Sequence, residues 1–507
     1  MTIMELHAIL PLLTLTGGIV CLMLQVAFFR SHGAALGTTL VVLLLAICAS
    51  LLVAAGLGNG IPSVQATALL LVDRQALLLC TLLLLAGVAV AILGRSYLRS
   101  RAIIPSATDH PEAFYILLLL CLLGACTLAC ASHFASFFLA LELVGLSLYP
   151  LLGFPLTGNG FAAQEREPAM ESAIKYLLLS ALTSALGLFG IALVYGATGA
   201  LEFAAVAAAI EGPAAASGLM QAGVTLVLAA MAFKLSLVPF HIWTPDVYQG
   251  APTPVTALIA TVSKAAAVAI LLRLLTLSGL GEETITTSLL TVLAVASILG
   301  GNLLALMQDD VKRLLAYSSI AHIGYLAVAL LIDGAFGGEA ALYYLIAYIV
   351  TTLGAFATVS LVADEAVTDV DRHNAAGMDP CAGTYFAGLF WRAPLLGGCF
   401  AAMLLSLAGI PLTIGFIGKF YIFAAGIEGE LWLVISAVIV GSALGLFYYL
   451  RLLLALFRRD HQRAAANGTA RQVSLDGQLL LLVLSVTLLA LGVFPQPLIN
   501  WLHALYT

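Results

Sequence analysis

Charged residues are the scarcest class in this sequence. Asp, Glu, Lys and Arg make up 9% of 507 residues, whereas apolar residues make up 62% and the mean hydropathy is +1.10. A soluble domain carries about 25% charged residues, so this chain has too few to cover a water-exposed surface or to remain disordered. Its 20 Lys and Arg residues are too few and too scattered to bind nucleic acid. The composition predicts an all-α polytopic membrane protein, with residues 1–507 in a single membrane domain.

The sequence also lacks the motifs of redox and metal chemistry. Three of its eight cysteines, Cys121, Cys126 and Cys130, lie in one apolar run without the spacing of a metal site. Buried cysteines of this kind behave as small apolar side chains. There is no Gly-rich nucleotide loop, iron–sulfur cysteine cluster or flavin signature. We therefore expect no cofactor and no metal in this chain.

Long apolar runs fill most of the chain. A helix that crosses a bilayer needs about 20 residues, and the sequence contains about fourteen such runs. The first has no basic residues before it, so we expect a retained span rather than a cleaved signal. The predicted spans are 8–28, 35–55, 75–94, 114–131, 134–153, 170–195, 219–247, 253–276, 286–307, 313–332, 339–362, 393–425, 431–457 and 475–499.

The basic residues are distributed unevenly among the predicted loops. Arg74 is the one basic residue in the even-numbered loops, and thirteen lie in the odd-numbered loops. Because positively charged loops stay in the cytoplasm, this bias predicts that both termini lie outside. The thirteen are Arg30, Arg95, Arg99, Arg101, Arg166, Lys312, Arg313, Arg372, Arg392, Arg458, Arg459, Arg463 and Arg471.

Several ionisable residues lie inside predicted spans, where a charge costs at least about 2.5–3.5 kcal/mol. A static set of ion pairs that fixes helix packing is one explanation, but so many groups on separate helices favour a polar path. Lysine suits proton exchange, because a desolvated ammonium can release its proton and a guanidinium does not. The two histidines are equally compatible with a structural role and with a relay. The set comprises Glu142, Lys175, Lys234, Lys264, Lys419, His241 and His322.

Other charges have simpler interpretations. Arg273 and Arg451 lie nearer the ends of their spans, and we expect them to snorkel to the membrane surface. Residues 363–385 are predicted to form an acidic loop, for which the sequence suggests no role. Its acids are Asp364, Glu365, Asp369, Asp371 and Asp379.

Two spans are expected to be broken helices. Pro239 lies in span 7 and Pro411 in span 12, and each removes a helical hydrogen bond. An ordinary proline kink is the alternative at either position. Non-helical backbone at this depth is tolerated only against protein or water, so each break indicates a polar cavity. Breaks five spans apart predict two inverted five-helix repeats, with spans 4–8 covering residues 114–276 and spans 9–13 covering 286–457.

Four segments carry a specific family pattern. They are ESAIKYLLLSALTSALGLFGIALVYGATG (171–199), FKLSLVPFHIWTPDVYQGAPTPVTALIATVSKAAA (233–267), NLLALMQDDVKRLLAYSSIAHIGYLAVAL (302–330) and LAGIPLTIGFIGKFYIF (407–423). The second is the most distinctive, since it joins a lysine, a Pro-Phe-His-x-Trp-x-Pro run and a Gly-Ala-Pro-x-Pro turn. Together these segments resemble the antiporter-like membrane subunits of respiratory complex I, and most closely the subunit N family of NADH-quinone oxidoreductase.

The resemblance implies a proton-translocating subunit in a bacterial inner membrane, with both termini on the periplasmic side. It would be a non-redox subunit of the enzyme, in contact with the lipid bilayer and with other membrane-arm subunits. NAD, FMN, iron–sulfur clusters and quinone would be bound by partner subunits. The alternatives are a stand-alone or Mrp-type cation/proton antiporter subunit, and a structural subunit whose charges only pack helices.

The resemblance also implies roles for single residues. Glu142 and Lys234 would form a pair, and loosening of that pair would release a proton toward Lys264 and Lys419. Lys175 would match a lysine of span 6, and Lys419 would lie on the outlet side. His241 and His322 would lie on or beside the hydrophilic axis.

Overall fold

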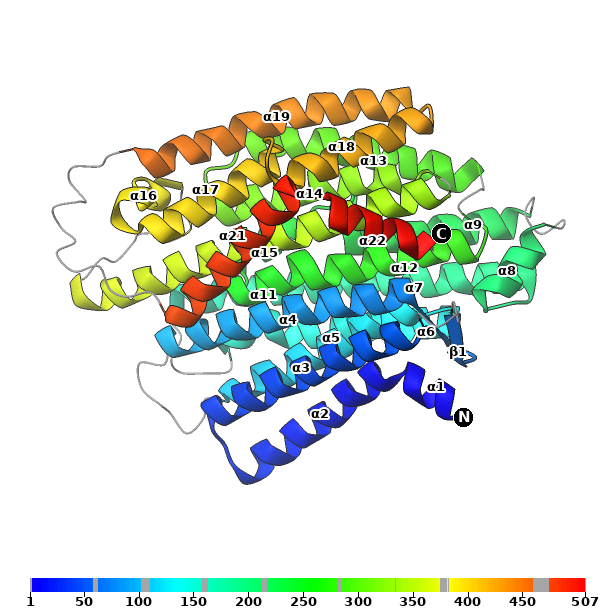
Figure 1. Cartoon of the computed structure of the whole chain (residues 1–507), viewed down its shortest axis with the longest axis horizontal. Coiled ribbons are helices and arrows are strands. Elements are labelled where there is room, and N and C mark those ends of the chain that lie inside the picture. The colour runs from blue at the N-terminus through cyan, green and yellow to red at the C-terminus, as the bar shows by residue number, and fades with distance from the viewer. Residues whose placement is uncertain are drawn as a thin grey trace.

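Long helices dominate this computed structural model, which describes residues 2–57, 63–101, 110–156, 163–211, 217–280, 284–332, 334–373, 381, 383–458 and 474–506. Most of them lie side by side and run between the same two ends of the molecule (Figure 1). Within the described residues, twelve helices are long and apolar enough to cross a membrane, judged by length and composition. The prediction of an all-α polytopic membrane protein is confirmed.

The elements follow one another along the chain as follows. The N-terminal part contains α1 (Ile3–Ala8), α2 (Leu10–Phe28), α3 (His32–Leu57), β1 (Ser63–Thr67), β2 (Leu70–Asp73), α4 (Arg74–Arg101), α5 (Pro111–Cys130), α6 (Phe134–Leu152), η1 (Phe154–Leu156), α7 (Ala163–Thr198) and α8 (Phe203–Ile210). The middle part contains α9 (Gly218–Leu235), α10 (Trp243–Gly250), α11 (Thr253–Leu258), the π-helical turn η2 (Ile259–Ser263), α12 (Lys264–Leu277), α13 (Thr284–Leu306) and α14 (Val311–Ala329). The C-terminal part contains α15 (Ala335–His373), η4 (Gly383–Phe386), α16 (Leu389–Arg392), α17 (Pro394–Ala408), α18 (Ile414–Glu428), α19 (Trp432–Phe457), α21 (Leu475–Val493) and α22 (Gln496–Tyr506).

Two spans are interrupted where the prolines predicted it. Span 7 is divided into α9 and α10, and the chain leaves the helix at Ser236, which has a φ of 64°. Span 12 is divided into α17 and α18, and the helix ends at Gly409, with a φ of 84° that glycine adopts without strain. Helix α14 and the pair α17–α18 occupy the two predicted spans that are not among the twelve continuous candidates.

Two predicted boundaries are wrong. The last span does not continue to residue 499, because α21 ends at Val493 and α22 begins as a separate helix after Pro495, which cannot donate a helical hydrogen bond. The predicted acidic loop starts too early, because α15 continues to His373. Asp364 lies in that helix and accepts a hydrogen bond from Ser100. The side chains of the other predicted acids, Glu365, Asp369, Asp371 and Asp379, lie outside the described part of the chain.

A short antiparallel hairpin, β1–β2, was not predicted, and it explains a buried arginine. Arg273 is 2% exposed, so the expectation that it snorkels to the surface is wrong. Its guanidinium forms a 3.0 Å ion pair with Asp73 and donates to the carbonyls of Leu71 and Ala131. Arg273 therefore joins α12 to the hairpin and to the end of α5. Arg451 remains exposed and donates to the carbonyls at the end of α13.

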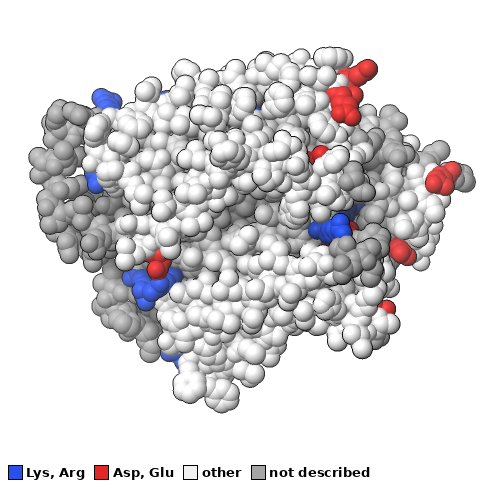
Figure 2. All heavy atoms as spheres, in the orientation of Figure 1, with Lys and Arg blue, Asp and Glu red and all other residues white. Residues whose placement is uncertain are grey.

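The visible flank of the molecule carries few charged side chains, which gather toward its two ends (Figure 2), and many large apolar side chains are exposed along the helices. Both termini lie at the same end, whereas α19 ends and α21 begins at the opposite end (Figure 1). A chain with an even number of spans has this arrangement. A broad apolar flank with charged ends suits a lipid bilayer, where charges are stable only near the surfaces.

Candidate functional site

Lys234 lies at the last turn of α9, directly before the first break, and is 5% exposed. Its ammonium donates a 2.7 Å hydrogen bond to the hydroxyl of Ser180 on α7, which also accepts from the hydroxyl of Tyr149 at 3.0 Å. The ammonium also lies 5.9 Å from the centre of the Tyr176 ring, within the range of a cation–π contact. The immediate partners of Lys234 are therefore uncharged.

Glu142 lies on α6 and does not form the direct ion pair with Lys234 that the sequence suggested. Among the described residues no carboxylate lies within 4.0 Å of the Lys234 ammonium, and the Glu142 oxygen Oε1 is buried without a hydrogen-bond partner. Gly145, one turn further along α6, would place a Cβ 3.6 Å from the lysine nitrogen. The two charges thus belong to one region but are separated.

Several of the buried polar atoms that have no hydrogen-bond partner among the described residues lie around the first break. They include the hydroxyls of Ser236 and Thr244 and the ring nitrogen Nδ1 of His241. An unpaired buried polar group costs about 1–3 kcal/mol, so such atoms are normally satisfied by protein or by ordered water. His241 lies in the non-helical segment between α9 and α10. The segment around the first break therefore carries several buried polar groups that the described residues leave unpaired.

Lys264 is fully enclosed, at 0% exposure, at the point where the π-helical turn η2 joins α12. It donates a 2.7 Å hydrogen bond to Ser319 on α14, and Ser319 is 2.6 Å from the hydroxyl of Tyr348 on α15. Tyr348 donates in turn to the carbonyl of Ala260 in the π-helical turn. A π-turn frees a backbone carbonyl from the regular ladder, and here that carbonyl anchors the polar group around Lys264.

His322 lies one turn beyond Ser319 on α14 and is 5% exposed. Both ring nitrogens face tyrosine hydroxyls: Nδ1 is 2.7 Å from Tyr344 on α15, and Nε2 is 3.1 Å from Tyr449 on α19. Tyr449 is also hydrogen-bonded to Ser318. The histidine therefore lies at the centre of a group of hydroxyls contributed by three helices.

Lys419 lies on α18, directly after the second break. Its ammonium donates to the carbonyls of Leu407 and Ala408 at 2.9 and 3.0 Å, the two residues at the end of α17. Cations are favoured at a helix C-terminus, where carbonyls lack intrahelical donors. Gly409 is needed for this approach, since a Cβ at that position would be 2.9 Å from the lysine side chain. The second break thus exposes backbone acceptors to a lysine.

A small cavity lies between the groups around Lys264, His322 and Lys419. Tyr348 belongs to the group around Lys264, and Leu407 supplies a carbonyl to Lys419. Both line the cavity with His322 and Tyr344. The remaining lining residues are Ala347, Thr351, Ser406 and Gly415. Residues in contact with each of the two lysines' partners therefore border one cavity beside His322.

Lys175 was expected to be buried, and this expectation is wrong. Its side chain is 39% exposed and forms ion pairs with Glu171 at 2.5 Å and Asp246 at 2.7 Å. Asp246, on α10, also pairs with Arg313 on α14 at 2.8 Å. Lys175 is thus part of a charged cluster at the edge of the bundle, whereas Lys234 and Lys264 are buried.

The sequence did not indicate the neutral partners of the lysines. Ser180 and Ser319 are serines within apolar helices, and such serines usually bond to their own helix rather than to another one. In the sequence, Tyr344, Tyr348 and Tyr449 cannot be told apart from ordinary aromatic residues of a helix core. Asp246 could have been identified from the sequence, since it lies within the distinctive TPDVYQGAPTP run.

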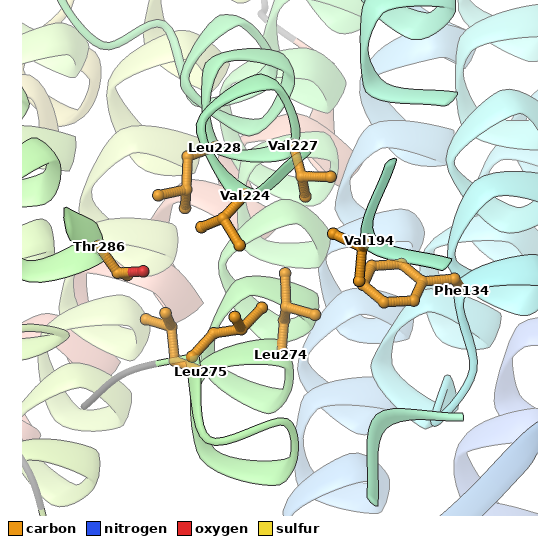
Figure 3. Close-up of a pocket in the computed structure, with 9 residues that line it drawn as sticks. Phe134, Val194, Val224, Val227, Leu228, Leu274, Leu275 and Thr286 are labelled. Carbon is orange, nitrogen blue, oxygen red and sulfur yellow. The ribbon is translucent and has the colours of Figure 1, made fainter. Parts of the chain in front are cut away.

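A second pocket shares no lining residue with the cavity beside His322 (Figure 3). The residues that line it are Phe134, Val194, Val224, Val227, Leu228, Leu274, Leu275, Leu280 and Thr286. Because its lining is almost entirely apolar, it offers no groups that exchange protons. Across the ranges that the structure describes, no group of three or more His, Cys, Asp and Glu residues is arranged to hold a metal ion.

The chain is similar to known membrane proteins over most of its length. The profile of the family described as "NADH:quinone oxidoreductase/Mrp antiporter, TM" matches residues 131–445. The NADH-quinone oxidoreductase subunit N of Ectopseudomonas mendocina (strain ymp) is 42% identical, over 99% of this chain and 97% of that protein. The protein of the same name from Chromohalobacter salexigens is 40% identical, over 98% of each.

Solved structures agree. A chain of respiratory complex I from Thermus thermophilus is 32% identical and has a TM-score of 0.75, over 97% of this chain and 98% of that one. A chain of the Mrp complex from Dietzia sp. DQ12-45-1b has a TM-score of 0.82 at 21% identity, over 100% and 97%. A chain of an archaeal membrane-bound sulfane sulfur reductase has a TM-score of 0.78 at 23% identity, over 99% and 96%. The last two show the shared fold alone.

The family profile covers more than half of the chain, and the two relatives are similar over nearly all of it. Lys234, Lys264 and Lys419 lie within the region that the profile covers. The chain therefore belongs to the subunit N family of NADH-quinone oxidoreductase, among the antiporter-like membrane subunits.

Proposed function

We propose that this chain translocates protons through the membrane arm of an NADH:quinone oxidoreductase, along an axis formed by Glu142, Lys234, Lys264, His322 and Lys419. The observation that carries the proposal is Lys264, which is completely enclosed and whose one hydrogen-bond partner within the described residues is the hydroxyl of Ser319. A permanent charge enclosed without a counter-charge is costly. A side chain that takes up and releases a proton suits this position.

Proton movement would follow the polar groups between the helices. Lys234 would exchange a proton with Lys264 past the unpaired hydroxyls at the first break, and Lys264 with Lys419 through Ser319, Tyr348 and the small cavity. The separation of Glu142 from Lys234 corresponds to a loosened pair, in which the carboxylate supports the ammonium least. Closer approach of Glu142 would hold the proton on Lys234.

Lys175 would act at the edge of this system, through Asp246 and Arg313, and His241 would line the passage at the first break. The family's redox chemistry would lie in partner subunits, which would bind NAD, FMN, iron–sulfur clusters and quinone. This chain would then be a non-redox subunit of the enzyme, in contact with other membrane-arm subunits.

The two breaks also support a repeated architecture. We propose two inverted five-helix repeats, residues 114–276 and 286–457, each with one broken helix and one lysine beside the break. An odd number of spans per repeat gives the two units opposite orientations. We further propose that both termini lie on the periplasmic side of a bacterial inner membrane.

Substitution of Lys264 by arginine in the assembled complex tests the function. Arginine keeps the charge but does not release its proton, so Lys264→Arg should abolish proton pumping coupled to NADH oxidation. Lys312→Arg is the matched control, because Lys312 is also buried but donates to the carbonyls of Gln249 and Ala251 at the end of α10. Assembly is checked on native gels. Wild-type pumping by an assembled Lys264→Arg complex would contradict the proposal.

A further inference from the structure

The hydrogen bonds around His322 form a chain of four groups. Tyr344 contacts Nδ1, Nε2 contacts Tyr449, and Tyr449 contacts Ser318. His322 and Ser318 lie on α14, whereas Tyr344 lies on α15 and Tyr449 on α19. All four residues are buried. The ring is thus held from both sides by groups that can donate or accept.

A neutral imidazole has one N–H donor and one acceptor nitrogen, so its two tyrosine partners cannot have the same role. In one arrangement Tyr344 donates to Nδ1, Nε2 donates to Tyr449, and Tyr449 donates to Ser318. In the other, Ser318 donates to Tyr449, Tyr449 donates to Nε2, and Nδ1 donates to Tyr344. The direction of the Tyr449 hydroxyl therefore decides which nitrogen carries the proton.

The two sides of the ring face different surroundings. Tyr344 and His322 line the cavity between the group around Lys264 and the carbonyl of Leu407, which Lys419 contacts. Tyr449 is not among the residues that line the cavity. Its hydroxyl contacts Nε2, whereas Nδ1 faces Tyr344 on the cavity side. The direction of the Tyr449 hydroxyl therefore determines whether Nδ1 donates or accepts a hydrogen bond.

We propose that Tyr449, supported by Ser318, is a positioning residue that sets the tautomer of His322 and so controls proton transfer between Lys264 and Lys419. This inference rests on the proposed function, because it assigns a control element to the same axis. It adds α19 to the helices that act on the axis.

A tyrosine outside this chain of hydrogen bonds provides a matched control. Tyr343 is buried like Tyr449, but its hydroxyl donates to the carbonyl of Leu491 at 3.2 Å rather than to the histidine. We expect Tyr449→Phe to lower proton pumping per NADH oxidised by about threefold to tenfold, the effect of losing one hydrogen bond, and to shift its pH profile. Tyr343→Phe should keep the wild-type profile, with pumping within about twofold of wild type.

A second comparison separates positioning from packing. If Tyr449 acts through His322, Tyr449→Phe should have no further effect in a His322→Gln background. Equal effects of Tyr449→Phe and Tyr343→Phe, or the same loss with and without His322, would overturn the inference. Should Tyr449→Phe fail to assemble on native gels, Ser318→Ala interrupts the chain from its other end and is judged by the same criteria.

Lys264→Arg, measured in the same membranes, separates the two proposals. If Lys264→Arg stops pumping and Tyr449→Phe pumps as wild type with an unchanged pH profile, the inference about Tyr449 is wrong and the axis stands. If the assembled Lys264→Arg complex pumps normally, the proposed function itself is wrong, and the inference falls with it.

Discussion

The ammonium of Lys234 donates to the hydroxyl of Ser180, 2.7 Å away, and does not pair with the carboxylate of Glu142. A lysine held by a hydroxyl keeps a defined position without gaining a full counter-charge. Ser180 also accepts from Tyr149, so the hydroxyl is itself fixed in place. Lys234 is therefore oriented by hydrogen bonds to neutral groups, and the nearby carboxylate of Glu142 acts on its charge without direct contact.

Removal of the Ser180 hydroxyl should impair proton pumping while the complex still assembles. Ser180→Ala deletes the acceptor of Lys234, and the loss of a hydrogen bond to a charged group, worth about 1.5 kcal/mol, corresponds to about a tenfold change in rate. Ser184→Ala is the control, because Ser184 lies one turn away on α7 and is buried without a hydrogen-bond partner. Quinone-linked pumping in membrane vesicles measures both. Similar rates for the two variants would argue against a role for Ser180.

Lys234 itself should have to release its proton. Lys234→Arg keeps the positive charge, so an assembled complex with depressed pumping is expected. Lys234→Met, which removes the charge, is the companion that distinguishes a lost proton carrier from the misfit of a larger side chain. Pumping is compared only after native gels show assembly. Wild-type pumping by assembled Lys234→Arg would show that this lysine need not deprotonate.

The sequence predicted those features that depend on local chemistry. Pro239 and Pro411 lie in the two breaks because proline lacks the N–H that a helix needs. Lys264 could be recognised because a charge within a long apolar run has no local explanation. The helical membrane class followed from the same apolar runs.

Features that depend on partners distant in the sequence could not be predicted. Arg273 was assigned to the membrane surface from its place in a span, but Asp73 and the β1–β2 hairpin enclose it from 200 residues away. Lys175 lies well inside its helix, as a buried residue would, yet its side chain faces the edge of the bundle. Helix periodicity is weak in a chain that is apolar on all sides, so it does not reveal which face is buried.

Loss of the Arg273 guanidinium should destabilise the protein strongly. Arg273→Met leaves Asp73 and two carbonyls without their donor, and breaking a buried ion pair in this way typically costs about 3–5 kcal/mol. We expect little assembled complex on native gels and a lower melting temperature. Arg451→Met should be milder, because Arg451 is exposed and its contacts among the described residues are to the carbonyls of Leu306 and Gln308. Comparable assembly of the two variants would contradict the importance of the hairpin contact.

The charge bias predicts the absolute topology. Reporter fusions after Thr507 should report a periplasmic C-terminus, and fusions within residues 458–474 a cytoplasmic loop, because basic loops are retained in the cytoplasm. The structure places the C-terminus at the end of the molecule opposite the end of α19 (Figure 1). A fluorescent reporter and an alkaline phosphatase reporter, each tested at both positions, provide opposite readouts. A cytoplasmic signal at the C-terminus would reverse the proposed orientation.

The carboxylate of Asp246 joins three helices and should contribute modestly to stability. It pairs with Lys175 on α7 and Arg313 on α14 while lying on α10, so it links the broken helix of the first proposed repeat to a helix of the second. All three side chains are about a third exposed, and screening reduces such pairs to about 0.2–1 kcal/mol each. We therefore expect Asp246→Asn to lower the stability of the detergent-solubilised complex by about 1 kcal/mol, with the loss diminishing at high salt.

Glu171→Gln, which removes one more exposed pair from Lys175 but none between the repeats, should have a smaller effect in the same thermal unfolding assay. If the two variants unfold alike at low salt, Asp246 does not connect the two halves.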